Sequence, residues 1–135
     1  MEKHGIARFK ILGWDEKTWK GEPAATAPSP KMTESIVRYS YSGTVEGESE
    51  LRYLMSYREA DGGFVGMERV EGAVGGKKGS FVFIHTGVFD EHAVSGELTM
   101  LDGSGTGELA GITGRGRLRI SGHAEYYEMD LSYSL

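Results

Sequence analysis

The stretch Glu68–Gly87, ERVEGAVGGKKGSFVFIHTG, decides the fold, because two segments of alternating character meet there at a glycine-lysine turn. Apolar residues alternate with polar ones on both sides of the turn, which is typical of a half-buried β-hairpin. If the turn is centred between Gly76 and Lys77, antiparallel pairing places Glu68 opposite His85. The hairpin therefore predicts that a carboxylate and an imidazole lie together on one face of a sheet.

The same alternation recurs along the chain from Thr33 onward, and glycine, at 21 of 135 residues, interrupts it at short intervals. No apolar period of 3.6 residues lasts long enough for a substantial helix. We expect strands at Ala7–Trp14, Thr33–Ser42, Glu48–Arg58, Phe64–Val74, Gly79–Phe89, Ala93–Leu101, Arg115–Ser121 and Ala124–Tyr133. Such strands suffice to close a small barrel. The sequence therefore predicts one all-β domain over residues 1–135, a closed antiparallel meander barrel of about eight strands.

Two connections in this pattern are longer than a hairpin turn. Gly21–Thr33 holds all three prolines of the chain and is expected to be a loop across one end of the barrel. Gly103–Gly116 is rich in glycine, and we expect a short helical turn within it, around Glu108–Ile112.

Composition excludes several classes of protein. Hydrophobic residues make up 39% and charged residues 26% of the chain, as in ordinary globular domains. The net charge of −5 argues against nucleic-acid binding, and the absence of cysteine excludes disulfides and thiol catalysis. The N-terminal residues lack the apolar segment of a signal peptide, and no run approaches the ~18 apolar residues of a membrane helix. We therefore expect a cytoplasmic protein that binds neither nucleic acid nor membrane.

The interior face of the predicted barrel is the face that carries the aromatic residues of the hairpin. Alternate residues of a strand share a face, and here one face holds Phe64, Val70, Phe81, Phe83 and Phe89. A second turn, centred between Ala60 and Asp61, would place Tyr53 opposite Glu68. The result is a row of Tyr53, Glu68 and His85 across three strands.

This row is the candidate site. Gly66 and Gly87 border it and leave space where larger side chains would fill the lumen, as a ligand cavity requires. The predicted ligand-binding residues are Tyr53, Met55, Tyr57, Phe64, Glu68, Val70, Phe81, Phe83 and His85. Glu68 and His85 could exchange a proton with a substrate, and Tyr53 could donate to a developing oxyanion. Alternatively, the three side chains form a polar network that only fixes the register of the strands.

The remaining candidates for lining the lumen or the end of the barrel are Tyr39, Tyr41, Tyr127, Tyr133, Met100 and Met129, most of which are expected to be plain core. The sequence lacks the motifs that metal binding and nucleotide binding require. The remaining histidines, His4, His92 and His123, show no HxH or HxxxH spacing, so we expect no metal site. The stretch GSGTG is followed by neither Gly-Lys-Ser/Thr nor a βαβ unit, so we expect no nucleotide and no other cofactor.

The outer face of the same two strands carries apolar side chains, at Val65, Met67, Val82, Ile84 and Val88. An exposed apolar patch of this kind often marks a protein interface. We therefore expect a homo-oligomer, with a dimer as the simplest case. By contrast, the arginines of RGRLRI, at positions 115–120, are expected to form a solvated barrel exterior.

The motif GSGTGELAGITGRG at positions 103–116 resembles the GGTGxFxGAxG stretch that precedes the final strands of allene oxide cyclases and dirigent proteins. The overall likeness is closer to a bacterial family of unknown function with the same barrel. It rests on Trp14-Asp15-Glu16 together with YLMSY, FVGMERVEG, GSFVFIHTG and GSGTGELAGI, and it covers nearly the whole chain. The resemblance implies an allene-oxide-cyclase-like barrel whose lumen binds an apolar or phenolic small molecule. The catalytic residues of the cyclases do not match this chain by motif, and none is transferred.

Three functions follow from this pattern. The first is the binding of an apolar or aromatic small molecule in the lumen, and the second is acid/base isomerisation or cyclisation in the same lumen without a cofactor. The third is a structural or assembly module with a packed lumen. The volume of the cavity separates the third from the other two.

Overall fold

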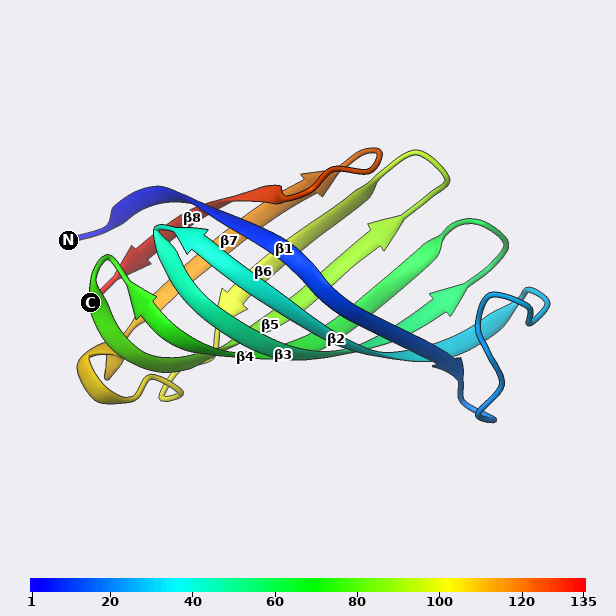
Figure 1. Ribbon diagram of the computed structural model, residues 1–135, viewed down its shortest axis with the longest axis horizontal. Coiled ribbons are helices and arrows are strands. Elements are labelled where there is room, and N and C mark those ends of the chain that lie inside the picture. Colours follow the sequence, from blue (N-terminus) through cyan, green and yellow to red (C-terminus); the bar gives the residue numbers. More distant parts are fainter.

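The protein is a closed barrel of eight antiparallel strands in the computed structural model, which describes all residues from 1 to 135 (Figure 1). Each strand pairs with the next one in sequence, and β8 pairs with β1 to close the barrel. The strands are β1 (Lys3–Thr18), β2 (Lys31–Gly43), β3 (Val45–Tyr57), β4 (Gly62–Val74), β5 (Lys77–Phe89), β6 (Val94–Met100), β7 (Thr113–Ile120) and β8 (Tyr127–Ser134). The predicted all-β meander barrel is therefore confirmed. None of its elements is a helix that could span a membrane.

The long connection after β6 closes one end of the barrel. It contains a single turn of 3-10 helix, η1 (Gly107–Leu109), within the stretch where a helical turn was expected. Leu109 and Ile112 are fully buried there. The backbone N–H groups of Ser80 and Val82 on β5 each donate to a hydroxyl of this connection, at 3.0 Å to Thr106 Oγ1 and 3.0 Å to Ser104 Oγ. Because β6 ends at Met100, the connection takes over its pairing role along β5.

The predicted register of β3, β4 and β5 is wrong by two residues. On β4 and β5, Val70 lies opposite Phe81 and Glu68 lies opposite Phe83. The turn consists of Gly75 and Gly76, whose φ angles are +57° and +84°. Two successive residues with positive φ are the requirement of the hairpin turn that matches strand twist, so glycine sets the centre of the turn one residue earlier than expected.

The same two-residue correction applies between β3 and β4, where Tyr53 lies opposite Gly66 rather than Glu68. His85 also lies opposite Gly66, on its other side. A shift of two residues leaves every side chain on its face, because the side-chain period of a strand is two. The residues that face inward were therefore predicted correctly, although the residue opposite each of them on the neighbouring strand was not.

A β-bulge at Leu12 changes which side chains of β1 face inward. Ile11 lies opposite Tyr39 and Gly13 lies opposite Arg38, so Leu12 is an extra residue in β1. Before the bulge Ala7 and Phe9 are buried. After it Trp14 lines the interior, which reverses the parity that an uninterrupted strand would have.

Candidate functional site

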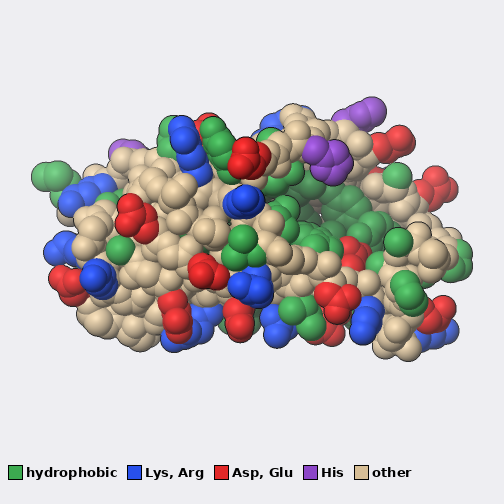
Figure 2. Space-filling model, in the orientation of Figure 1, with side chains coloured by type: hydrophobic (Ala, Val, Ile, Leu, Met, Phe, Trp, Pro, Cys, Tyr) green, Lys and Arg blue, Asp and Glu red, His purple; other side chains and the backbone are tan.

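The barrel is hollow in the half that faces away from η1. A cavity of about 430 Å³ lies there, and 14 of its 21 lining residues are hydrophobic. Figure 2 shows this hollow with hydrophobic walls and histidine side chains near its rim. The lining comes from all eight strands and from the loops of the β3–β4, β5–β6 and β7–β8 hairpins. This volume argues against a fully packed lumen.

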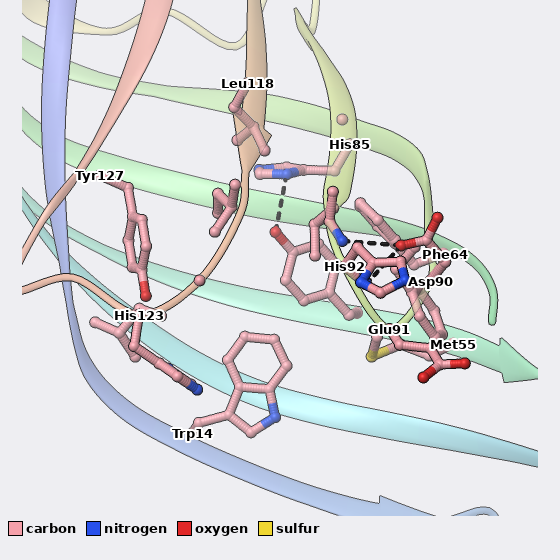
Figure 3. Close-up of a pocket in the computed structure, with 18 of the residues that line it drawn as sticks. Trp14, Met55, Phe64, His85, Asp90, Glu91, His92, Leu118, His123 and Tyr127 are labelled. Carbon is pink, nitrogen blue, oxygen red and sulfur yellow. Dashed lines mark hydrogen bonds between the residues drawn. The ribbon is translucent and has the colours of Figure 1, made fainter. Parts of the chain in front are cut away.

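The entrance lies beside the C-terminal half of β1. This strand pairs with β8 only over Lys3–Phe9, so its later residues have no strand partner on that side. Ile11 and Trp14 of β1 line the cavity, together with Gly122 and His123 of the β7–β8 loop. In Figure 3 Trp14, His123 and Tyr127 lie on one side of the cavity, and Asp90, Glu91 and His92 lie on the other.

A chain of hydrogen bonds leads from the inner wall of the cavity into the core. The hydroxyl groups of Tyr39 and Tyr53 are 3.3 Å apart, and Tyr53 Oη lies 3.1 Å from His85 Nδ1 (Figure 3). His85 Nε2 lies 2.7 Å from Glu68 Oε1. Both nitrogens of the imidazole are therefore engaged. Gly66 makes this arrangement possible, because a Cβ atom at this position would lie 2.7 Å from the Tyr53 ring.

Glu68 lies behind His85 and has no exposed surface. Its Oε2 atom accepts hydrogen bonds from Tyr41 Oη at 2.6 Å and from Ser49 Oγ at 2.5 Å. The buried polar side chains of the barrel have no unpaired nitrogen or oxygen atom. The carboxyl group is therefore held in place by three partners, and it reaches the cavity only through His85 and Tyr53.

The buried phenols of Tyr39, Tyr41 and Tyr53 stay protonated over the whole neutral range. Burial, assisted by the nearby Glu68 carboxylate, raises the pKa of Tyr41 well above its ordinary value, and burial also raises the pKa of Tyr39 and Tyr53. Low polarity disfavours the charged phenolate. The hydroxyl groups at the inner end of the cavity are therefore neutral hydrogen-bond donors.

Polar groups at the entrance are fixed by a local turn. The carboxylate of Asp90 accepts hydrogen bonds from the backbone N–H groups of His92 and Ala93, at 2.7 and 2.9 Å. These bonds lower the pKa of Asp90. They hold the β5–β6 loop in one shape beside the entrance. No cluster of three or more His, Asp or Glu side chains here or elsewhere is arranged to hold a metal ion.

The residues predicted from the sequence divide into two groups. Five of them line the cavity: Tyr53, Met55, Tyr57, Phe64 and His85. The other four lie in the packed half of the lumen and do not line it: Glu68, Val70, Phe81 and Phe83. Phe83 and not His85 lies directly opposite Glu68, so the side chains of Glu68 and His85 meet diagonally. Of the further lining expected, Tyr39 and Tyr127 line the cavity.

Trp14 is the main residue of the cavity wall that was missing from the predicted ligand-binding residues. Its ring lies 5.8 Å from that of Tyr53, and its Nε1 donates to Glu16 Oε1 at 3.0 Å. Glu16 in turn accepts hydrogen bonds from Tyr57 and Thr33 at the same end of the barrel. The only signal in the sequence was Gly13, since a glycine inside a strand often marks a bulge.

Comparison with known proteins agrees with this architecture. The sequence pattern of the family described as "Protein of unknown function (DUF3224)" matches residues 5–133. A crystal structure of a protein with unknown function from the DUF3224 family of Shewanella oneidensis MR-1 is similar over 100% of this chain and 98% of that chain, with a TM-score of 0.79 and 21% identity. At this identity the likeness shows the fold alone. No curated protein matches the sequence.

Proposed function

This chain belongs to the DUF3224 family, whose function is unknown, and we propose that it binds an apolar or aromatic small molecule inside its barrel. The observation that carries the proposal is the cavity of about 430 Å³ with mostly hydrophobic walls. Ligand sites in proteins have such volumes, roughly 300–1,000 Å³, and combine apolar walls with a few polar groups that orient the ligand. Tyr39, Tyr53 and His85 supply these groups at the inner end.

The walls favour a flat ring system. The aromatic side chains of Trp14, Tyr53 and Phe64 lie around the same space, with the Tyr53 and Phe64 ring centroids 5.1 Å apart. Burial of apolar ligand surface against them stabilises a complex by about 25 cal/mol per Å² before the costs of association. A bicyclic aromatic molecule with one polar substituent suits both the walls and the inner end.

Methyl naphthyl ketone is a suitable probe for this proposal. We expect it to bind when titrated calorimetrically, and to shift the backbone NMR signals of residues that line the cavity, such as Gly96 and Leu118. Gly96→Leu would place a side chain into the hollow, because Gly96 lines the cavity and the nearest atoms to its Cβ position, from Leu118 and Phe64, are at an ordinary contact distance of 3.4–3.5 Å. We expect this variant to stay folded and to lose binding.

Thr99→Leu is the matched control, because it adds a similar side chain to the outer face of the same strand, β6. It is expected to bind the ketone like the wild type. Absence of binding to the wild type, or equal binding by both variants, would contradict a ligand site in the lumen. Native mass spectrometry of the purified protein would further show whether it carries a small molecule of its own.

A second candidate function, cofactor-independent isomerisation or cyclisation, is favoured by the chain of phenol, imidazole and carboxyl groups. If the Glu68–His85 pair holds a single proton, so that His85 Nδ1 is bare, a substrate with an acidic C–H bond could give its proton to Tyr53 Oη while the phenolic proton of Tyr53 passes to His85 Nδ1. The substrate would become an enolate while the imidazolium is paired with Glu68, and return of the proton along the same path to another carbon would complete the isomerisation. Catalysed exchange of the methyl protons of the bound ketone in D₂O, lost in Glu68→Gln with binding retained, would support this activity.

A further inference from the structure

The direction of the hydrogen bonds at the inner wall follows from the number of protons on the Glu68–His85 pair. Tyr41 and Ser49 can only donate to Glu68 Oε2, since neither hydroxyl has another partner. One proton must lie between Glu68 Oε1 and His85 Nε2, which are 2.7 Å apart. A second proton, if present, lies on His85 Nδ1, whether the first belongs to the imidazole or to the carboxyl group.

Each of these two states gives Tyr53 a different role. With one proton on the pair, His85 Nδ1 accepts from Tyr53, and Tyr53 Oη in turn accepts from Tyr39, so both phenolic protons are used inside the protein. With two protons, His85 Nδ1–H donates to Tyr53 Oη. The two phenols then need only one of their two protons for the bond between them. The other proton has no acceptor in the protein.

Burial favours the state with two protons. The one-proton pair carries a net negative charge, whereas the two-proton pair is neutral overall, as an ion pair or as two uncharged groups. Glu68 is 0% and His85 1% exposed, and the only ion pair that either residue makes is with the other. A net charge in such surroundings is costly. No cation compensates it: the neighbours are Tyr41 on β2, Tyr53 and Ser49 on β3, Phe83 on β5, and Leu98 opposite on β6.

We propose that the Glu68–His85 pair holds two protons and so keeps one phenolic O–H of Tyr39 or Tyr53 free, which makes the cavity selective for ligands with an acceptor oxygen such as a ketone or ester carbonyl. This inference rests on the proposed binding function and names the chemical class of its ligand. A ligand that only donates hydrogen bonds would leave the free O–H unpaired in the complex. Tyr39 and Tyr53 both line the cavity, so a carbonyl oxygen at its inner end can receive this proton.

A pair of probes of equal shape tests the selectivity. Isopropenylnaphthalene differs from methyl naphthyl ketone only in a CH₂ group where the ketone has its oxygen. Because the alkene is the more hydrophobic of the two, burial alone favours it. We expect the ketone nevertheless to bind about 2- to 10-fold more tightly at neutral pH, as one added hydrogen bond would allow. Equal or tighter binding of the alkene would overturn the inference and leave the proposed function intact.

Glu68→Gln is the informative variant. The amide oxygen of Gln can accept from Tyr41 and Ser49, and its amide nitrogen can donate to His85 Nε2, so the proton of a neutral imidazole stays on Nδ1. We therefore expect the variant to keep the preference for the ketone. If wild type shows no preference and Glu68→Gln gains one, the pair holds a single proton and the inference is wrong.

The protonation of His85 can also be measured directly in the ligand-free wild type. Imidazole ¹⁵N NMR distinguishes a protonated Nδ1 from a bare one, and single Gln substitutions of the exposed His4, His92 and His123 leave the signals of His85 assigned by elimination. We expect a proton on Nδ1. A bare Nδ1 would overturn the inference even if Glu68→Gln fails to fold. If neither naphthalene probe binds, the proposed function fails, while the NMR result still decides the proton count.

Discussion

At the scale of single residues, Glu68 is the group on which the interior of the barrel depends most. It is fully buried and accepts from Tyr41 and Ser49 while facing His85. A buried carboxyl group without such partners would be strongly destabilising. The residue therefore links β2, β3, β4 and β5 through polar contacts within an otherwise apolar lumen.

Replacement of Glu68 by Ala is expected to lower the free energy of unfolding by about 3–5 kcal/mol, because three buried polar groups lose their common partner. Glu68→Gln, which keeps the shape and an acceptor oxygen, is expected to lose clearly less. Urea unfolding followed by circular dichroism measures both. A loss below about 1 kcal/mol in the Ala variant would show that the network contributes little to stability.

The same residues show what could be predicted from the sequence at this scale. Alternation placed Tyr53, Glu68 and His85 on the inner face, and this placement survived an error of two residues in register. Which of them touch the cavity could not be predicted, because it depends on how neighbouring strands are offset. That offset is set by the turn, whose two residues with positive φ angles are Gly75 and Gly76. The stretch GGKK alone does not show which two of its residues form the centre of the turn.

At the scale of elements, β1 and the connection after β6 determine where the barrel is open and where it is closed. The bulge at Leu12 turns Trp14 toward the lumen on the open side. The connection with η1 fills the opposite end with Leu109 and Ile112. The glycine-rich stretch predicted a short helical turn, but nothing in its pattern indicated that the turn plugs the barrel. A plug requires contacts with residues far away in the chain.

Leu109→Ala is expected to destabilise the fold by about 2–5 kcal/mol, because the side chain is fully buried and its removal leaves a cavity at the closed end. Leu101→Ala is the matched control in the same connection, since Leu101 is 41% exposed. The control is expected to change stability by no more than about 0.5 kcal/mol. Thermal or urea unfolding measures both, and similar losses would contradict the role of Leu109 as a plug. Because the cavity proposed to bind a ligand is at the other end, both variants should still bind methyl naphthyl ketone.

At the scale of the whole molecule, the outer face of β3 and β4 carries exposed apolar side chains. Leu54, Val65 and Met67 are 45%, 49% and 54% exposed, and Leu54 lies directly opposite Val65. Val88 on β5 is exposed as well, whereas Val82 and Ile84 are half-buried. Such a patch favours association, and the homo-oligomer predicted from the sequence remains our proposal.

Sedimentation velocity tests this proposal. We expect the wild type to have at least twice the chain mass of 14.7 kDa. The double variant Val65→Lys/Met67→Lys is expected to be a monomer, because association would bury two unpaired charges. Ile6→Lys, at an exposed position on β1, is the control and should behave like the wild type. A monomeric wild type would contradict the proposal.

The tyrosines of the lumen also couple the stability of the whole barrel to alkaline pH. Burial raises the pKa of Tyr39, Tyr41, Tyr53 and Tyr57 above the value of 10.0 that an unfolded chain would show. Below this value the phenols are neutral in both states, and their contribution to stability is fully present. Above it they ionise only in the unfolded chain, so the free energy of unfolding falls as the pH rises.

We therefore expect alkaline unfolding to be cooperative, and ionisation of these four tyrosines, out of seven in the chain, to accompany it. Phenolate absorbance and circular dichroism, recorded on the same samples, measure the two processes. The absorbance of the four should appear in the same step in which the β-sheet signal is lost. Complete ionisation of all seven tyrosines with an intact sheet signal would mean that solvent reaches the inner wall freely. The barrel would then lack the dry interior on which the proposed selectivity of its cavity depends.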